Sequence, residues 1–265
     1  MTYDARFLGT ADALPIPSRD GLVTLDYTHF AVSMDTGRRL AAVTAVTIDG
    51  SDLRDVERGD DWRLDPRLPA SQQAGPELYS GNDLDRGHLV RRRDPVWGED
   101  AERANADTFH YTVCAPQTAT LNQSTTLWLG LEDYVLDHAR QYGERLSVFT
   151  GCLFESDDPV YRGVAIPRRF FKVAAWAQDE GLAATGYVLD QTDSLGPILE
   201  RGVRADDVPP LGAYRTYQVP IADIAAATDL AMPMLVDADR LASVPAARPV
   251  PWIELTGPED LRLER

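Results

Sequence analysis

One short segment of this 265-residue chain gathers side chains that could move a proton beside a phosphate. Residues 83–93 hold one imidazole, four guanidiniums and two carboxylates, and Gly87 directly precedes His88. Histidine titrates near neutral pH, so it can accept a proton from water. Arginines beside it could bind a phosphodiester or stabilise developing negative charge. Taken alone, the segment also fits a solvated charged turn with an incidental histidine.

A second run of residues adds amide and carboxylate side chains in a fixed order. Val-Cys-Ala-Pro-Gln (113–117) is followed by Leu-Asn-Gln (121–123), Trp128 and Leu-Glu (131–132). Thr-Gly (150–151) and Ile-Pro-Arg-Arg-Phe-Phe-Lys (166–172) come later. Together with Asp-Arg-Gly-His (85–88), these blocks resemble the DNA/RNA non-specific endonucleases, the sugar-non-specific ββα-metal nucleases of the endonuclease G-like kind. A four-residue match is weak alone, whereas several matching blocks in the right order are specific.

The resemblance runs from about residue 25 to about residue 230. It implies a single nuclease domain over residues 1–265, with residues 1–20 and 245–265 peripheral. The implied fold is α+β, the ββα-metal nuclease fold, in which a central mixed or antiparallel β-sheet is flanked by helices and long loops. The implied activity is metal-dependent hydrolysis of phosphodiester bonds in DNA and RNA, with little sequence specificity and with 5′-phosphate products.

The same resemblance implies roles for four residues. His88 would be the general base that activates water, and Arg86 would support the transition state or the scissile phosphate. Asn122 would be the single protein ligand of a Mg²⁺ ion, with Mn²⁺ as the alternative ion, and Glu132 would orient metal-bound water. An amide oxygen suits Mg²⁺, which prefers oxygen ligands and keeps most of its waters. The structural alternatives are a helix N-cap or turn residue for Asn122 and an exposed helix acid for Glu132.

Further basic and amide residues are expected around the site. Two runs could give positive potential on an acidic chain: Arg86 with residues 91–93, and residues 162–172, which contain four basic residues and no acid. The expected substrate contacts are Arg91, Arg92, Arg93, Arg168 and Arg169, and the expected supporting residues are Asp85, Gln117 and Gln123. For any single arginine, surface solubility or a structural ion pair is the alternative role.

Two departures from the family pattern concern the metal site. Val113 stands where the family usually has Asn, which puts a supporting hydrogen bond near the metal in doubt. The spacing from Asn122 to Glu132 is two residues longer than the usual pattern, and two residues would rotate a side chain on a helix by 200°. We therefore expect Asn122 on a turn or a short separate segment, with residues 124–126 accommodating the extra length.

Composition bounds the class of protein. With 26 basic and 42 acidic residues the formal net charge is −16, which argues against a protein that coats nucleic acid over its whole surface. No stretch reaches the roughly 18 apolar residues of a membrane helix. Residues 1–17 lack the features of a signal peptide, so a cytoplasmic location is the default, with export by another route left open. Cys114 and Cys152 are expected as buried hydrophobic residues without a disulfide framework.

Two other functions compete with that of an active enzyme. A catalytically weak family member could act as a nucleic-acid-handling or protein-interaction module; Val113 and the acidic balance favour it, and the four intact site residues oppose it. An acidic mimic of DNA would explain the charge but not the histidine–arginine cluster. A cytoplasmic non-specific nuclease would be toxic, so an inhibitor protein or export is expected to restrain it. The oligomeric state stays open.

The elements that must position these residues follow from local patterning. A short strand or turn at residues 87–90 is predicted to carry His88. Residues 50–82, rich in Gly, Pro, Asp and Arg, are predicted to form a long loop with residues 62–66 as an anchor. Strands are predicted at residues 27–34, 40–48, 108–113, 146–154, 170–177 and 183–189, and helices at residues 99–107, 126–142 and 221–228.

Overall fold

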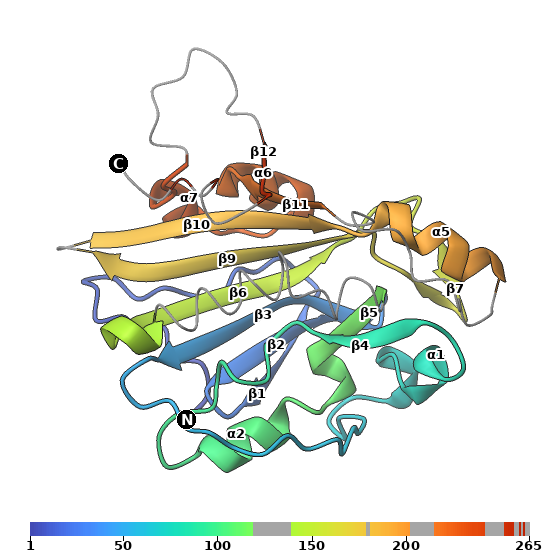
Figure 1. Ribbon diagram of the computed structural model, residues 1–265, viewed down its shortest axis with the longest axis horizontal. Helices are drawn as coiled ribbons and strands as arrows, with labels where there is room; N and C mark the ends of the chain where they lie inside the picture. The colour runs from blue at the N-terminus through green and yellow to red at the C-terminus, as the bar shows by residue number, and fades with distance from the viewer. Residues whose placement is uncertain are drawn as a thin grey trace.

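Runs of β-branched, aromatic and alanine residues form the central β-sheet of the chain (Figure 1). The computed structural model describes residues 1–118, 139–178, 181–201, 215–241 and 252–256, with Asp260 and Arg262; the side chains of residues 197–201 are not described. The sheet has eight strands in the order β1-β2-β3-β6-β9-β10-β11-β12, and neighbouring strands are antiparallel. The strands are β1 (Val23–Tyr27), β2 (Phe30–Asp35), β3 (Leu40–Asp49), β6 (Arg145–Leu153), β9 (Arg169–Gln178), β10 (Gly181–Asp190), β11 (Arg215–Val219) and β12 (Ile253–Glu254).

Both faces of the sheet are buried, which explains why its central strands are apolar at most positions. All ten residues of β3 are buried. Side chains alternate between the two faces along a strand. On β6, Val148 therefore belongs to one hydrophobic cluster and Phe149 to the other, and on β9 Phe170 and Phe171 divide in the same way.

Different segments cover the two faces. On the face of Val148, residues that flank the Asp-Arg-Gly-His segment and its partner strand complete the core, among them Leu89 and Ala115. On the face of Phe149, the cover is formed by the N-terminal segment, α6 (Ile221–Thr228) and α7 (Pro233–Asp237). Figure 1 shows α6 and α7 beside β10. The histidine–arginine segment thus lies on the face opposite to α6 and α7.

Local patterning predicted much of this architecture. The predicted strands at residues 40–48, 146–154, 170–177 and 183–189 are confirmed as β3, β6, β9 and β10, and the helices at residues 99–107 and 221–228 as α2 (Ala101–Asp107) and α6. The α+β fold with a large antiparallel sheet is confirmed. The predicted helix at residues 126–142 lies outside the described residues except for residues 139–142, which are helical.

Two predicted strands are wrong in their bounds. Residues 27–34 do not form one strand: β1 ends at Tyr27, β2 begins at Phe30, and His29 between them has a left-handed backbone with φ 65°. Residues 108–113 are not a strand either. They end in the 3₁₀-helix η2 (Tyr111–Val113), and the strand β5 (Cys114–Thr118) begins only afterwards. Every residue from Thr108 to Thr118 is buried, so the apolar alternation there reflects packing rather than a half-exposed strand.

The remaining elements are short and surround the loop before His88. Residues 50–82 are mostly irregular, as predicted, apart from η1 (Ala70–Gln72) and α1 (Pro76–Tyr79). Strand β4 (Leu84–His88) begins three residues before the predicted 87–90. A small hairpin, β7 (Val160–Tyr161) with β8 (Val164–Ala165), and α5 (Thr192–Arg201) complete the described elements. Among the described helices, none has the length and apolar character needed to cross a membrane.

Candidate active site

The Asp-Arg-Gly-His segment is the strand β4, and it pairs with β5 outside the eight-stranded sheet. In this antiparallel pair Arg86 lies opposite Pro116 and His88 opposite Cys114. Because side chains alternate along a strand, Arg86 and His88 share one face of the ladder, and Asp85 and Gly87 share the other. The sequence therefore places the imidazole and the guanidinium side by side through strand geometry alone.

Gly87 is needed for a close approach of Gln117. A Cβ atom on Gly87 would lie 2.1 Å from Cδ and Oε1 and 2.4 Å from Cγ of the Gln117 side chain. Gln117 is buried, and its Nε2 has no hydrogen-bond partner among the described residues. The Gln117 carboxamide thus packs directly on Gly87, on the face of the ladder opposite to Arg86 and His88.

His88 is half-buried, and one of its two ring nitrogens is placed to accept a proton. Its ring makes a hydrogen bond to the backbone of Thr108, while Nε2 is buried and has no partner in the part of the chain that the structure describes. The bond to the Thr108 carbonyl therefore assigns the proton to Nδ1. Burial, together with the positive charges of Arg58 and Arg92, lowers the pKa of His88 to about 3. The imidazole is neutral at physiological pH and keeps a lone pair on Nε2.

Arg86 is held between an aromatic ring and a carboxylate. Its guanidinium carbon lies 4.9 Å from the centroid of the Trp62 ring, and its Nη2 lies 3.7 Å from Oδ1 of Asp60. Trp62 also packs against His88, with ring centroids 5.0 Å apart. Both neighbours come from the loop before β4, so this loop forms a wall of the site.

The wall is fixed to the rest of the fold by backbone and buried polar contacts. The Arg63 N–H donates to the Phe109 carbonyl, and the Tyr111 N–H donates to the Arg63 carbonyl, both at 3.0 Å. Two residues on, Asp65 accepts hydrogen bonds from the Arg67 guanidinium and, at 2.5 Å, from the Tyr27 hydroxyl of β1. The predicted anchor at residues 62–66 is thus tied both to the segment before β5 and to the edge of the sheet.

One arginine of the site has no recognisable signal in the sequence. Arg58 is exposed, and its charge lowers the pKa of both His88 and Arg92. Within the described ranges Arg58 makes no hydrogen bond or ion pair. Arg92 itself donates to the carbonyls of Val56 and Asn105. Three guanidiniums, of Arg58, Arg86 and Arg92, thus act on one neutral imidazole.

The other predicted substrate contacts already have partners within the chain. Arg91 is buried and has a protein partner, and Arg93 pairs with Asp55 at 3.4 Å. Arg168 pairs with Asp157 at 3.3 Å and lies within 4 Å of two further carboxylates, and Arg169 pairs with Glu155. These contacts give the arginines structural roles, and their contact with substrate stays a prediction. Asp85 also has a partner within the protein.

The predicted metal ligand and its neighbours, Asn122, Gln123 and Glu132, lie outside the described residues. The described part of the chain holds no group of three or more His, Cys, Asp or Glu side chains that could bind a metal ion. Val113, at the position where the family usually has Asn, is fully buried in the hydrophobic cluster on the β4 side of the sheet. It contributes packing there, not a side-chain hydrogen bond.

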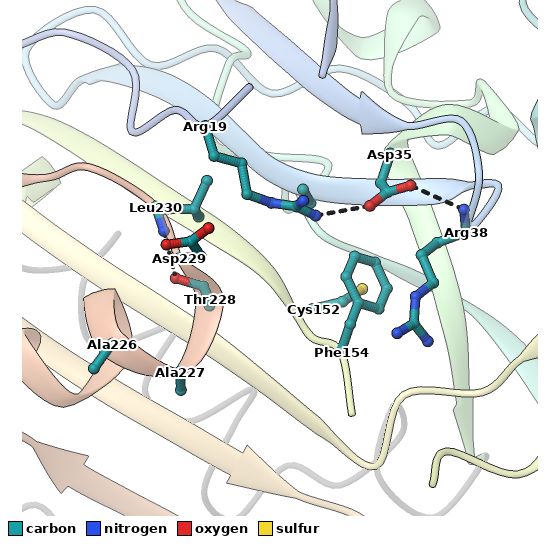
Figure 2. Close-up of a pocket in the computed structure, with 11 residues that line it drawn as sticks. Arg19, Asp35, Arg38, Cys152, Phe154, Ala226, Ala227, Thr228, Asp229 and Leu230 are labelled. Atoms are coloured by element: carbon teal, nitrogen blue, oxygen red, sulfur yellow. Dashed lines mark hydrogen bonds and ion pairs between the residues drawn. The ribbon is translucent and has the colours of Figure 1, made fainter. Parts of the chain in front are cut away.

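A cavity of about 280 Å³ lies between the end of β2, the end of β6 and the end of α6, and none of the predicted site residues lines it. Figure 2 shows Arg19 and Arg38 on either side of Asp35. Asp35 accepts hydrogen bonds from the Arg19 guanidinium at 2.7 Å and from the Arg38 N–H at 2.9 Å. Asp35 therefore partly neutralises the charge of Arg19 in this cavity.

Comparison with known proteins gives a consistent result. A sequence model of the DNA/RNA non-specific endonuclease family matches residues 10–239. The uncharacterized protein y4fB of Sinorhizobium fredii is 42% identical over 221 residues, 76% of this chain and 32% of that protein. A nuclease of Nostoc sp. is 30% identical over 159 residues, 60% of this chain and 56% of that protein. Human mitochondrial endonuclease G is 35% identical over 125 residues, 43% of this chain and 40% of that protein.

The chain spans between about a third and somewhat more than half of the length of these relatives. A chain in the crystal structure of the EndoG/EndoGI complex has the same fold, with a TM-score of 0.61 and 19% sequence identity. That superposition covers 87% of this chain and 91% of the other.

Proposed function

Because the chain belongs to the DNA/RNA non-specific endonuclease family, we propose that it is a metal-dependent endonuclease that hydrolyses phosphodiester bonds of DNA and RNA with little sequence specificity, giving 5′-phosphate products. One arrangement carries the proposal: a neutral imidazole, whose Nε2 has no partner among the described residues, is surrounded by the positive charges of three arginines. A general base needs the first feature, and an anionic substrate needs the second.

His88 takes the role of general base. Its Nδ1–H is held by the Thr108 carbonyl, which orients the ring and leaves Nε2 to accept a proton from the attacking water. Arg86 and Arg58 bind the scissile phosphate. Burial and the charges of Arg58, Arg93 and Arg91 lower the pKa of Arg92, so a bound phosphate would relieve repulsion among these guanidiniums. Such contacts read the backbone and not the base edges, in keeping with weak sequence preference.

The site is compatible with a hydrated divalent cation. Nε2 of His88 is a buried polar atom without a partner among the described residues, which suits a site completed by water and phosphate. We propose Asn122 as the protein ligand of Mg²⁺ or Mn²⁺ and Glu132 as the residue that orients bound water. When bound, the ion would supply charge neutralisation at the transition state and at the leaving 3′ oxygen.

The test is digestion of plasmid DNA and of RNA at low salt with Mg²⁺, Mn²⁺ or EDTA. We expect cleavage of both substrates with metal and none with EDTA. His88→Ala should lower the rate about 10²- to 10⁴-fold, and Asn122→Ala should abolish metal-dependent activity. Val160→Ala is the control for the handling of the variants, because Val160 is 73% exposed and lies in the β7–β8 hairpin, outside the β4–β5 pair.

Two outcomes would contradict parts of the proposal. Folded wild-type protein that cleaves neither substrate with any metal would favour the binding-module alternative. Cleavage retained by His88→Ala would remove the proposed base while leaving a nuclease. The acid side of the pH–rate profile is informative as well: since the pKa of His88 is lowered to about 3, activity should persist well below pH 6.5.

An inhibitor protein is a further part of the proposal. It is supported by the solved complex of EndoG with EndoGI, which describes inhibition of EndoG. The active chain would be expressed in its native host and in a foreign host and then isolated by affinity. A protein from the native host that is isolated with the chain would be a candidate inhibitor. Harmless expression of active enzyme in a foreign host would contradict the need for restraint.

A further inference from the structure

The structure assigns to Trp62 the role of a positioning residue: its indole supports the Arg86 guanidinium and packs against the His88 ring, so that the two side chains keep one relative orientation. This inference rests on the proposed function, because it concerns the geometry of His88 as the proposed base and of Arg86 as a proposed phosphate-binding residue. Trp62 is not proposed to touch the reacting atoms. Its effect passes through the two β4 residues.

The contacts join one ring to both functional side chains. The guanidinium carbon of Arg86 lies 4.9 Å from the indole centroid, a distance at which a cation is attracted to the aromatic face. The His88 ring centroid lies 5.0 Å from the indole, with 50° between the planes. Arg86 and His88 are two residues apart on the same face of β4, so one large ring can contact both.

The indole is itself held in place. Its ring packs edge-on against Phe109, with centroids 5.4 Å apart and planes at 81°, and lies 5.7 Å from the Tyr111 ring. The next residue, Arg63, is bound through its N–H and its carbonyl to the segment that carries these rings. A ring fixed on several sides can hold the flexible Arg86 side chain in one orientation. The guanidinium is then already oriented to bind phosphate before the substrate arrives.

The indole also keeps water away from His88. Trp62 lies beside the imidazole, and Phe109 meets it edge-on with centroids 5.6 Å apart. The other groups that face His88 are the Thr108 carbonyl and the charges of Arg58, Arg92 and Arg86. The Thr108 carbonyl and the charges of Arg58 and Arg92 do not depend on Trp62, so a change in the acid side of the pH–rate profile would report the loss of the indole together with the release of Arg86.

The experiment compares Trp62→Leu, Trp62→Met and Trp62→Phe, with Trp252→Phe as the matched control. Trp252 bonds Asp223 and packs on Tyr217, away from β4. Leucine or methionine at position 62 should lower kcat about 10- to 100-fold, change KM less than about 3-fold, and move the acid limb of the pH profile upward, toward the ordinary histidine value near 6.5. Phenylalanine keeps an aromatic face and should retain most of kcat, and Trp252→Phe should match the wild type.

Thermal melting separates positioning from folding. If Trp62→Leu does not fold, Trp62→Met, whose side chain is longer and flexible, decides the question. Wild-type kcat and pH profile in a folded Leu or Met variant would overturn the inference, and so would a Phe variant as impaired as the Leu variant. Failure of the proposed function is distinguishable, because it would appear as an inactive wild type or an active His88→Ala, whatever Trp62 does.

Discussion

Replacing Gly87 by alanine tests the close packing of the Gln117 side chain on β4. The added Cβ would meet Cγ, Cδ and Oε1 of Gln117 at 2.1–2.4 Å, and no other residue contributes one of the three nearest atoms. Gln117 is 2% exposed, so its side chain has little room to move away. Overpacking of this kind costs about 1–3 kcal/mol, and each kcal/mol lowers the melting temperature of a chain of roughly this length by about 2–4 °C. Activity should fall too, because Gly87 lies between Arg86 and His88.

A double-mutant cycle distinguishes the clash from other effects of the alanine. Gly87→Ala, Gln117→Ala and the double variant would be compared by urea and thermal unfolding. Removal of the Gln117 side chain should make Gly87→Ala nearly harmless, with a coupling of about 1–2 kcal/mol. Gly196→Ala is the matched control, since nothing lies within 4 Å of its added Cβ. Losses that add within about 0.5 kcal/mol would refute the reasoning.

Two further predictions concern acids near the site. Burial by itself raises the pKa of Asp65, but hydrogen bonds from Arg67 and Tyr27 lower it to about 2; its stabilisation is therefore complete above the unfolded value of 3.8 and is lost as pH falls through 2. Asp65→Asn should lower the free energy of unfolding by about 2–4 kcal/mol at pH 7 and by less near pH 2. Urea unfolding of the wild type and the variant at both pH values would measure this difference. Equal stability of the two proteins at pH 7 would contradict the prediction. Asp60→Asn should lower KM about 2- to 5-fold at low salt and have little effect at high salt, because the exposed carboxylate 3.7 Å from Arg86 competes with substrate phosphate. Steady-state kinetics of both proteins at two salt concentrations would measure this change in KM. A KM that rises in the variant would contradict the prediction.

The pairing of Arg86 with His88 could be predicted from the sequence because the two residues are close together in the chain. Arg86 and His88 are two residues apart, and any strand there would place them on one face. Arg58 could not be found in this way, since it lies in a loop without periodicity, and only the anchored path of that loop brings it near His88. The number of arginines at residues 91–93 does not predict how many of them are available to bind substrate. Arg91 is buried and Arg92 bonds backbone and amide oxygens, which composition does not reveal.

The same contrast holds for the fold. The central strands were predictable because burial on both faces leaves apolar runs such as that of β3. The apolar positions at Phe109, Tyr111 and Val113 repeat with the period of a strand, yet the first two rings pack around Trp62 and the third residue enters the core. The turn at His29 was also missed, because a left-handed histidine carries no turn signal like that of Asn-Gly or Asp-Gly.

The separate pairing of β4 with β5 has a consequence for how activity responds to heat. β3 is hydrogen-bonded to neighbours on both sides, whereas β4 pairs with one strand over five residues and, in the described chain, joins no strand of the large sheet. Opening β4 breaks backbone hydrogen bonds to one strand only, so we expect the ladder to form a unit of lower local stability than the sheet. Amide hydrogens of β4 should exchange faster than those of β3, and catalysis should be lost, reversibly, at temperatures where the sheet is still intact.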